Sequence, residues 1–414
     1  RYFEKGKKNK IIKIKNIPIG LPICEDIWSE AFVNNLVDEG AEIILNLSAS
    51  PYTTSKKETR KKMLSSYYKK YQRPIVYVNQ TGGQDELVFD GSSLILGSSE
   101  NSLVELKSFE IDSLNFEYRD SKINFLNSCF TNDQNNLKDV YDALVLGTKD
   151  YVEKNNFRGV LIGSSGGIDS ALTAAIAYDA LGKGRVKTIM MPFDFTADIS
   201  IEDAGLLAKN LGIEHSEISI NEMYESFSLA LKESFEGMGI DKTEENLQSR
   251  CRGVTLMALS NKLGFLVLTT GNKSEAAVGY STLYGDTAGG FSVLKDVSKT
   301  LVYELANYRN SLSVVIPKRI IERPPSAELA PDQKDTDSLP DYDRLDPIIE
   351  MYVEDDKSIQ EIINEGFDEK EVRRIVSLID FNEYKRRQAP LGIKISDRNF
   401  GKDRRYPITN SWKP

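Results

Sequence analysis

The sequence VLIGSSGGIDS, residues 160–170, decides the fold of the larger part of this chain. Residues 159–162 are small and apolar, which predicts a buried strand, and a helix is predicted to follow from Ala171. The loop between them, residues 165–170, lies at a helix N-terminus, where free backbone N–H groups and the helix dipole favour an anion. Its glycines allow close approach of the backbone, Ser165 and Ser170 supply hydroxyl groups, and Asp169 can hold the Mg²⁺ that accompanies a polyphosphate. The sequence therefore predicts a pyrophosphate-binding loop.

Two other phosphate-binding loops do not fit these residues. A Walker-type loop needs a Lys after its last glycine, and the dinucleotide fingerprint needs three glycines at fixed spacing, whereas only two are aligned here. A plain Gly/Ser turn is the alternative that a short motif alone leaves open. The motif SGGxDS between a strand and a helix resembles the PP-loop of the ATP pyrophosphatases, which split ATP between its α- and β-phosphates. This resemblance implies that ATP is a co-substrate.

The composition bounds the class of protein. A chain of 414 residues is expected to form two or three domains. Its formal net charge of −9 argues against nucleic acid as a partner, and no apolar run is long enough to span a membrane. Cys24, Cys129 and Cys251 are too scattered for a disulfide framework, so we expect a cytoplasmic protein. His215 has no second His or Cys at ligand spacing, which indicates a structural or surface role.

Strand and helix patterns alternate along the chain, which predicts the α/β fold class. The second half predicts a doubly wound parallel sheet, in which ligands bind outside the carboxyl ends of the strands. We place one domain at residues 1–120, a polar connector at 121–139 and a second domain at 140–414. The predicted strands lie at 17–24, 42–45, 74–79, 86–96, 103–111, 159–162 and 186–191, and the predicted helices at 28–39, 137–154 and 201–211, with a basic helix that ends at Tyr71.

Four further segments carry a resemblance that covers most of residues 140–414. Together with the PP-loop, these segments resemble the NAD synthetases. The resemblance implies a PP-loop ATP pyrophosphatase domain that uses ATP and Mg²⁺ to amidate deamido-NAD. The segments are ENLQSR at 245–250, LVLTTGNKSE at 266–275, YGDTAGGF at 284–291 and NEYKRRQ at 382–388. The ATP-binding residues that the resemblance implies are Gly163, Ser164, Ser165, Gly166, Gly167, Ile168, Asp169, Ser170 and Thr270.

The resemblance also places deamido-NAD at Asn246, Glu275 and Lys385, and the Mg²⁺ ion at Asp169 and Glu275. Taken singly, Asn246 fits a helix N-cap equally well, and Arg250 fits a solvated helix position. Lys385 lies in a basic run, and such runs usually form solvated faces. Glu275 is the stronger candidate, because it follows a buried strand and a Thr-Gly-Asn turn, where an acid is seldom placed for packing.

The resemblance has two further implications for this half. It implies that the side chains of Lys295 and Lys299 reach phosphates. The chain also departs from the family after Met191 and Pro192, where relatives carry small polar residues and a Tyr or Ser. This chain has FDFT at residues 193–196, so we expect its adenine pocket to differ in detail.

Cys24 lies in LPICED, residues 21–26, where an apolar strand is predicted to turn into a helix. A helix N-terminus and a nearby cation can activate a thiolate, although a Cys in an apolar setting is more often a small core residue. Together with NLSASPY at 46–52 and GQDELVFDG at 83–91, this segment resembles the nitrilase-type amidases. The resemblance implies part of a nitrilase-like α/β sandwich, with Cys24 as the nucleophile.

The pairing of such an amidase with a PP-loop domain resembles the glutamine-dependent NAD synthetases. It implies glutamine contacts at Ser50 and Lys56. The family order of catalytic residues is Glu, Lys, then Cys, and the first two would precede Arg1. We therefore expect the sequence to be a fragment, and Glu25 does not substitute for either residue.

The expected activity follows from both resemblances. We expect a carbon–nitrogen ligase that converts deamido-NAD to NAD through an acyl-adenylate, with ammonia supplied by the hydrolysis of L-glutamine. The resemblance further implies a homo-oligomer. Two alternatives stay open, an amidohydrolase with a non-catalytic nucleotide-binding module and a catalytically silent assembly subunit.

Overall fold

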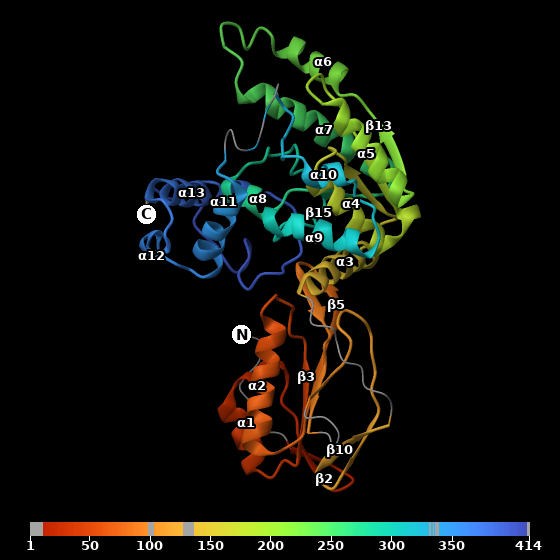
Figure 1. Cartoon of the computed structure of the whole chain (residues 1–414), viewed down its shortest axis with the longest axis vertical. Coiled ribbons are helices and arrows are strands. Elements are labelled where there is room, and N and C mark those ends of the chain that lie inside the picture. The colour runs from red at the N-terminus through yellow and green to blue at the C-terminus, as the bar shows by residue number, and fades with distance from the viewer. Residues whose placement is uncertain are drawn as a thin grey trace. The chain divides into compact units, whose positions relative to one another are not determined.

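A computed structural model describes residues 11–97, 103–126, 136–330, 333, 335 and 339–411, and the chain divides into two compact units (Figure 1). Unit 1 comprises residues 1–83 and 87–143, and unit 2 comprises residues 84–86 and 144–414. Three features of the sequence analysis lie outside the described residues, namely Arg1, Cys129 and positions 127–135 of the predicted connector.

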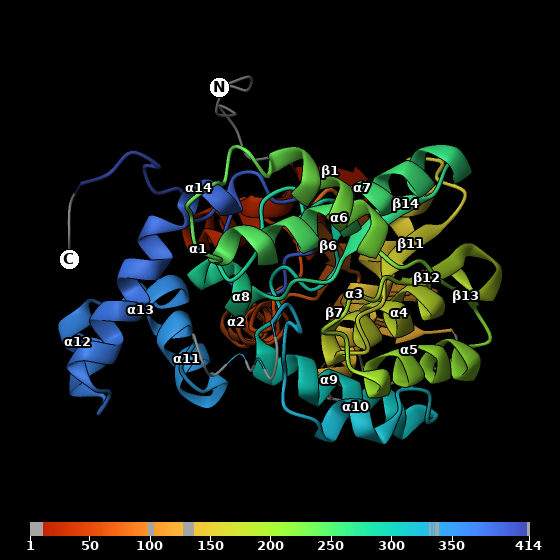
Figure 2. The ribbon, with the colours of Figure 1, turned by 90° about the horizontal axis from the view of Figure 1, so that it is seen from above.

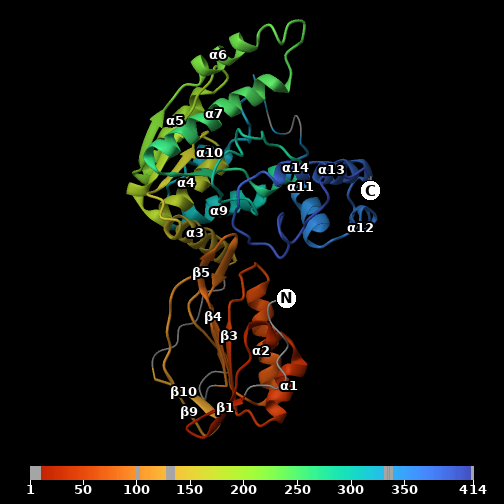
Figure 3. The ribbon, with the colours of Figure 1, turned by 180° about the vertical axis from the view of Figure 1, so that it is seen from behind.

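Unit 1 is built on a mixed sheet. Six of its described strands pair in the order β1-β2-β3-β4-β7-β8, in which β2, β3 and β4 run parallel and the outer pairs run antiparallel. Helices α1 and α2 lie together on one side of these strands in Figure 3. The elements are β1 (Ile11–Ile14), β2 (Ile17–Gly20), β3 (Ile43–Ser48), β4 (Ile75–Asn79), β7 (Leu94–Leu96), β8 (Leu103–Glu105), α1 (Glu30–Asp38) and α2 (Lys56–Tyr71).

Both faces of this sheet are buried. Neighbouring residues of a strand point to opposite sides, so they join different clusters. On one face Ile44 packs in a cluster with Leu64 of α2. On the other face Val76 packs in a cluster with Ile123. Ile123 belongs to the hairpin of β9 (Phe116–Arg119) and β10 (Lys122–Phe125), so the segment predicted as a connector at 121–139 overlaps a strand of the unit 1 core.

Several strands of unit 1 are shorter than predicted. The strand predicted at 17–24 ends at Gly20, and Cys24–Trp28 forms the short 3₁₀ helix η1. The strand predicted at 86–96 divides at Gly91, whose φ of +63° turns the chain out of the ladder. Its first part, β6 (Leu87–Asp90), pairs with β5 (Thr81–Gln84) instead, and β7 forms from the second part.

Unit 2 contains the predicted doubly wound parallel sheet. Its five described strands pair in the order β13-β12-β11-β14-β15, and every neighbouring pair is parallel. Figure 2 shows α6 and α7 on one side of these strands and α4 and α5 on the other. The elements are β11 (Val160–Gly163), β12 (Val186–Met190), β13 (Glu214–Glu217), β14 (Leu266–Thr269), β15 (Phe291–Ser292), α3 (Asn136–Lys154), α4 (Ile168–Leu181), α5 (Asp198–Leu211), α6 (Asn221–Leu231), α7 (Lys242–Leu263) and α9 (Lys299–Leu312).

The strand order reverses at β11. The chain passes from β11 to β12 and β13 on one side, whereas β14 and β15 lie on the other side. The carboxyl end of β11 is therefore the topological switch point of the sheet, where open α/β sheets form a crevice for ligands. The loop predicted to bind pyrophosphate follows directly from this strand end.

A helical layer from the C-terminal part completes unit 2. Ile348, Val353, Val372 and Ile375 form one buried cluster with Ala277. This packing joins the last helices to α8, which follows the β14 strand end, and so brings the C-terminal segment to the same edge of the sheet. The helices are α8 (Lys273–Val278), α10 (Lys318–Glu322), α11 (Tyr342–Ile349), α12 (Ile359–Asn364), α13 (Glu369–Phe381) and α14 (Glu383–Arg386).

None of the helices among the described residues has the length and apolar character needed to cross a bilayer.

Candidate functional site

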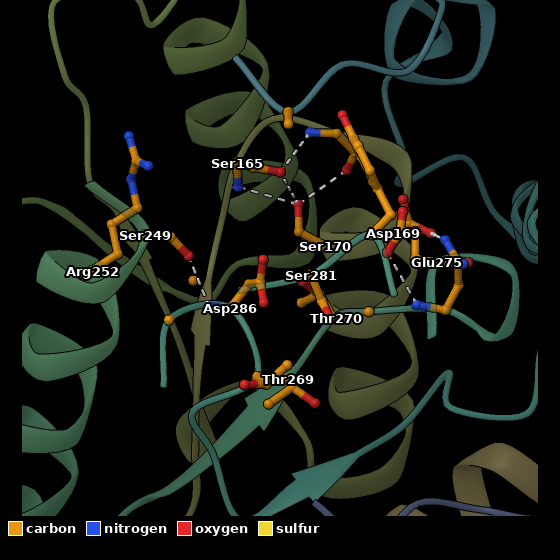
Figure 4. A pocket seen from close by; sticks show the side chains of 18 of the residues that line it. Ser165, Asp169, Ser170, Ser249, Arg252, Thr269, Thr270, Glu275, Ser281 and Asp286 are labelled. Carbon is orange, nitrogen blue, oxygen red and sulfur yellow. Dashed lines mark hydrogen bonds between the residues drawn. The ribbon is translucent and has the colours of Figure 1, made fainter. Parts of the chain in front are cut away.

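The phosphate-binding loop is held in shape by its own hydroxyl groups. The backbone N–H of Ser165 donates to Ser170 Oγ at 3.3 Å, and the N–H of Gly167 donates to Ser165 Oγ at 3.2 Å (Figure 4). Ser170 Oγ in turn donates to the Gly167 carbonyl at 3.0 Å. These bonds bend the chain between β11 and α4, so that the N-terminus of α4 faces a cavity with its free N–H groups.

Gly166 allows this bend. Its φ is +75°, and a Cβ atom built on it would lie 2.3 Å from the Ser200 carbonyl oxygen in the first turn of α5. Any side chain at this position would therefore force the loop away from α5.

Gly166→Ala is expected to lower kcat/KM for ATP at least about tenfold, because the left-handed backbone alone costs roughly 1 kcal/mol and the clash displaces the loop. Steady-state kinetics with ammonium as nitrogen donor measure this effect. Gly205→Ala in α5 is the control, because nothing lies within 4 Å of its Cβ position. Equal kinetics of the two variants would contradict this account of the loop.

Two carboxylates meet one buried lysine beside the loop. Lys299 Nζ lies 2.5 Å from Asp169 Oδ2 and 3.6 Å from Glu275 Oε1, and its side chain is 2% exposed. Asn272 donates from Nδ2 to Asp169 Oδ1 at 2.9 Å and accepts from the Glu275 N–H at 3.0 Å, as N-cap of α8. The α4 and α8 N-termini thus hold Asp169 and Glu275 toward one point (Figure 4).

The charges of this cluster depend on one another. Burial raises the pKa of Glu275, the nearby Asp169 raises it further, and Lys299 lowers it, with the net pKa at about 8. Burial lowers the pKa of Lys299, but Asp169 and Glu275 raise it by more, so the ammonium stays charged. The cluster therefore holds one fixed positive charge and one carboxyl group, that of Glu275, whose ionisation a bound cation would favour.

The donor set suits Mg²⁺ in the presence of a polyphosphate. Mg²⁺ is usually held by one or two carboxylates together with waters and substrate phosphates. The described residues contain no set of three His, Cys, Asp or Glu side chains placed for a metal. Asp169 and Glu275 fit such an ion only if phosphate oxygens complete its coordination.

A cavity of about 320 Å³ joins these groups. Ten of the residues predicted for this site line it, whereas Gly166 and Asn246 do not. Lys295 and Lys299 line it too, but Lys295 Nζ donates to the Pro390 carbonyl, and Lys299 contacts carboxylates. The ten predicted lining residues are Gly163, Ser164, Ser165, Gly167, Ile168, Asp169, Ser170, Thr270, Glu275 and Lys385.

Asn246 has a different local role from a helix N-cap. The N-cap of α7 is Asp241, which accepts from the Thr243 N–H at 2.7 Å. Asn246 instead accepts from Thr282 Oγ1 at 2.7 Å, in the loop after α8. Arg250 is exposed and donates from Nε to the Leu283 carbonyl at 3.2 Å.

Lys385 lies where the C-terminal segment reaches the cavity. Its Nζ donates to the carbonyls of Gly279 and Ser281 at 2.7 and 2.8 Å. Burial lowers the pKa of Lys385, while the charge of Asp286 raises it. Asp286 is exposed as a residue, but desolvation of its carboxyl group raises its pKa to about 6 despite N–H donation from Thr282.

Sequence analysis missed Asp286, Ser249 and Arg252, which also line the cavity. Asp286 is the one acidic residue in the segment YGDTAGGF, which is the signal that could have pointed to it. Ser249 and Arg252 lie three residues apart and share one face of α7, which a helical projection would have shown.

The residues expected to pack near an adenine are partly elsewhere. Phe193 forms ring contacts with Phe195 and Tyr224, at centroid distances of 5.5 and 4.8 Å, and so packs toward α6. Only Thr196 of residues 193–196 lines the cavity. His215 lies on β13 with Nδ1 at 2.9 Å from Thr188 Oγ1.

Cys24 occupies a strained turn in unit 1. It begins η1 with a φ of +49°, a left-handed value that is uncommon for a residue other than glycine. Ile23 bridges to Leu47 of β3 in parallel, which places Cys24 at the carboxyl ends of the parallel strands. The partly buried thiol thus stands at a strand end and a helix start, as the sequence predicted.

Lys56 and Ser50 lie on the elements next to this turn. Lys56 Nζ stands 4.1 Å from the ring centroid of Trp28, the last residue of η1. Ser50 is buried after β3, and its N–H donates to Asn79 Oδ1 at 2.8 Å. Cys251 differs from Cys24, because it is buried inside α7 and burial raises the pKa of its thiol.

Comparison with known proteins agrees with this division of the chain. Residues 140–389 match the NAD synthase family, and residues 1–113 match the carbon–nitrogen hydrolase family. The glutamine-dependent NAD(+) synthetase of Acinetobacter baylyi is 48% identical over 418 residues, covering 100% of this chain and 77% of that protein. That of Thermotoga maritima is 45% identical, covering 100% of this chain and 78% of that protein.

A solved structure shares the fold. The glutamine-dependent NAD+ synthetase from Acinetobacter baumannii, determined in complex with ADP, matches with a TM-score of 0.74 at 45% identity. The match covers 99% of this chain and 76% of that chain.

Proposed function

The chain belongs to the NAD synthase family, in the glutamine-dependent group that also carries a carbon–nitrogen hydrolase domain. We propose which of its residues bind each substrate and which take part in the reaction. The enzyme is a carbon–nitrogen ligase that amidates deamido-NAD to NAD with ATP and with ammonia from glutamine. One observation carries our assignment of the ligase site. The phosphate-binding loop and the Asp169–Glu275 pair face the same cavity.

ATP binds with its β- and γ-phosphates on the loop. The α4 N–H groups and the Ser165 and Ser170 hydroxyls donate to the phosphate oxygens, and Thr270 contacts the same nucleotide from the end of β14. Lys299 keeps its charge in this buried position and adds a cation at the edge of the phosphate site. These donors are fixed before the substrate arrives, so they need little reorganisation during the reaction.

Asp169 and Glu275 would hold Mg²⁺ against the phosphates of ATP. When bound, the ion would neutralise charge on the leaving pyrophosphate. The raised pKa of Glu275 means that its carboxyl group releases a proton as the cation binds. Asn272 keeps both carboxylates oriented through its side-chain amide and its N–H.

Adenylation joins the two substrates in the cavity. An oxygen of the nicotinate carboxylate attacks the α-phosphorus of ATP, the bond from that phosphorus to the β-phosphate oxygen breaks, and pyrophosphate leaves. Ammonia then attacks the carbonyl carbon of the acyl-adenylate, AMP leaves with the attacking oxygen, and loss of a proton gives the amide of NAD. We assign Asn246, Glu275 and Lys385 to the deamido-NAD side, with Lys385 held by the Gly279 and Ser281 carbonyls.

The ammonia is released in unit 1. Cys24 Sγ attacks the amide carbon of glutamine, ammonia leaves after proton transfer, and water hydrolyses the thioester to glutamate. The left-handed turn presents the thiol beyond the strand end, and we assign Ser50 and Lys56 to glutamine binding. The base for this step is left unassigned among the described residues.

We further propose a homo-oligomeric enzyme of the cytoplasm. Large apolar side chains stand exposed on and after α6, where Leu229 is 74%, Met238 72% and Ile240 89% exposed, and a second copy of the chain would cover them. Cys24 and Cys251 both carry free thiols, which suits a reducing compartment.

Pyrophosphate release with deamido-NAD and ATP tests the function, run once with ammonium and once with glutamine. We expect pyrophosphate and NAD in equal amounts with ammonium. No product with ammonium would overturn the ligase assignment. Product with ammonium but not with glutamine would overturn the assignment of Cys24 to an active glutaminase in the chain tested.

A further inference from the structure

Arg252 is a cation that lines the cavity near the end of β12, and it has no role in the proposed reaction so far. It stands on α7, is partly buried, and donates from Nε to the Met191 carbonyl at 3.0 Å. This bond fixes the guanidinium plane at the carboxyl end of β12, while the remaining N–H groups have no hydrogen bond within the described structure. Burial lowers the pKa of Arg252 to about 10, so the group stays charged at neutral pH.

The charge of Arg252 is not balanced by the described part of the protein. None of the ion pairs among the described residues includes it, and Glu328 is the acid whose charge raises its pKa. Glu328 is already bound by Arg323 Nη2 at 2.5 Å and by Ser200 Oγ at 2.7 Å. A partly buried guanidinium without a partner costs free energy unless a ligand supplies an anion.

A second unpaired group lines the same cavity. Ser164 is 3% exposed, and its Oγ atom is buried without a hydrogen-bond partner. The Ser164 N–H donates to the Ile189 carbonyl of β12 at 2.9 Å, which ties it to the strand whose end holds Arg252. A hydroxyl that lines a cavity and lacks a partner among the described residues is available to a ligand.

The position of Arg252 separates it from the carboxylate pair. Figure 4 shows Ser249 and Arg252 on one side of the view and Asp169 and Glu275 on the other. The apolar side chains that line the cavity include Met190, Met191 and Leu256, on the β12 end and on the α7 face that also carries Arg252. Apolar walls suit a nucleoside base, and the loop with its carboxylates suits pyrophosphate.

We propose that Arg252 and the Ser164 hydroxyl bind the α-phosphate of ATP. The α-phosphate joins the nucleoside of ATP to its pyrophosphate. Ser164 directly precedes the phosphate-binding loop, and Arg252 shares α7 with the apolar lining residue Leu256, so each of the two surfaces contributes one of these groups. The proposal rests on the proposed function, which makes ATP the ligand of this cavity. It assigns a ligand to Arg252, which the PP-loop resemblance leaves unexplained, and names the phosphate for Ser164, which the resemblance already places at ATP.

The contact strengthens as adenylation proceeds. When the carboxylate oxygen attacks the α-phosphorus and the bond to pyrophosphate breaks, negative charge builds on the non-bridging oxygens of that phosphorus. The two terminal NH2 groups of the guanidinium match two such oxygens, and charge-assisted bonds of this kind are among the strongest in proteins. After pyrophosphate leaves, the same bonds hold the phosphate of the acyl-adenylate and finally of AMP.

Calorimetric titration of the full chain with adenosine, AMP and pyrophosphate tests the proposal without deamido-NAD. Arg252→Ala is expected to weaken AMP binding by about 10- to 100-fold, the range for one to two charged hydrogen bonds, with adenosine and pyrophosphate changed less than about threefold. Arg252→Lys is expected to recover part of the AMP affinity. Lys262→Ala, which removes an exposed cation from the last turn of α7, is the matched control and leaves all three affinities unchanged.

Arg252→Ala also removes the hydrogen bond to the Met191 carbonyl and could unfold the protein for that reason. Ser164→Ala is a second variant that tests the proposal in that case. Because the Ser164 hydroxyl has no hydrogen-bond partner among the described residues, this variant is expected to melt at the wild-type temperature and to bind AMP about threefold to tenfold more weakly. Equal losses for adenosine and AMP, unchanged AMP affinity in both variants, or wild-type AMP binding no tighter than adenosine would each overturn the proposal. A protein that binds AMP in this way and makes no NAD would instead overturn the proposed function alone.

Discussion

Cys24→Ala is expected to abolish glutamine-dependent NAD formation, by at least about 10³-fold, and to leave ammonium-dependent formation within about twofold. The thiol is the atom that bonds to glutamine, so no other side chain can replace it in the thioester step. The ligase site lies in a separate unit with its own core, and free ammonia does not need Cys24. NAD formation by the wild type and the variant, measured once with glutamine and once with ammonium, gives the glutamine-dependent and the ammonium-dependent rate.

The matched control for this prediction is Cys251→Ala. Cys251 is 2% exposed inside α7, so its replacement costs a small amount of packing and removes no nucleophile. Retained glutamine-dependent activity in Cys24→Ala would show that another residue attacks glutamine. The same would follow if Cys251→Ala, rather than Cys24→Ala, lost the glutamine-dependent rate.

Glu275→Gln is expected to lower NAD formation by about 10²- to 10³-fold with either nitrogen donor. The amide preserves the size of the side chain but removes the charge that pairs with the cation. Both donors are affected, because adenylation precedes the use of ammonia. Glu304→Gln on α9, an exposed acid outside the loop and carboxylate cluster, is the control and is expected to retain the wild-type rate. A Glu275→Gln enzyme with more than about one-tenth of the wild-type rate would contradict the role of this carboxylate.

The pH dependence of Mg²⁺ activation tests the same carboxyl group. Because the pKa of Glu275 is raised to about 8, the group is mostly protonated at pH 6 and must lose a proton when the cation binds. The Mg²⁺ concentration for half-maximal rate is therefore expected to fall as pH rises from 6 to 8, at most tenfold per pH unit. In Glu275→Gln this dependence is expected to be lost, and a wild-type profile that stays flat would contradict the assignment.

The phosphate-binding loop could be predicted from sequence because its geometry is local. The apolar strand, the two glycines and the following helix fix the chain path within about one turn, and the switch point at β11 follows from the order of elements. The position of Glu275 could be predicted for the same reason, since it lies in the first turn of α8, which follows the end of β14.

Side-chain positions that depend on contacts between segments distant in the sequence could not be predicted in this way. Lys299 was expected at phosphates, but its ammonium contacts two partly buried carboxylates, Asp169 and Glu275. The sequence of α7 gives no sign that Arg252 differs from the solvated charged residues of that helix. Only the fold shows its contact with Met191 at the end of β12. The left-handed backbone conformation of Cys24 could not be predicted from the sequence either. The apolar residues before Cys24 continue the strand pattern past Gly20, where the strand ends.

The most direct test of the central claim follows the carboxylate oxygens of the substrate. Deamido-NAD labelled with ¹⁸O in its nicotinate carboxylate is converted with ATP and ammonium, and the products are analysed by mass spectrometry. Attack on the α-phosphorus predicts one ¹⁸O atom in each AMP and none in pyrophosphate, since the attacking oxygen leaves with AMP. Label in inorganic phosphate with ADP as the nucleotide product, or AMP without label, would contradict an acyl-adenylate formed at the phosphate-binding loop.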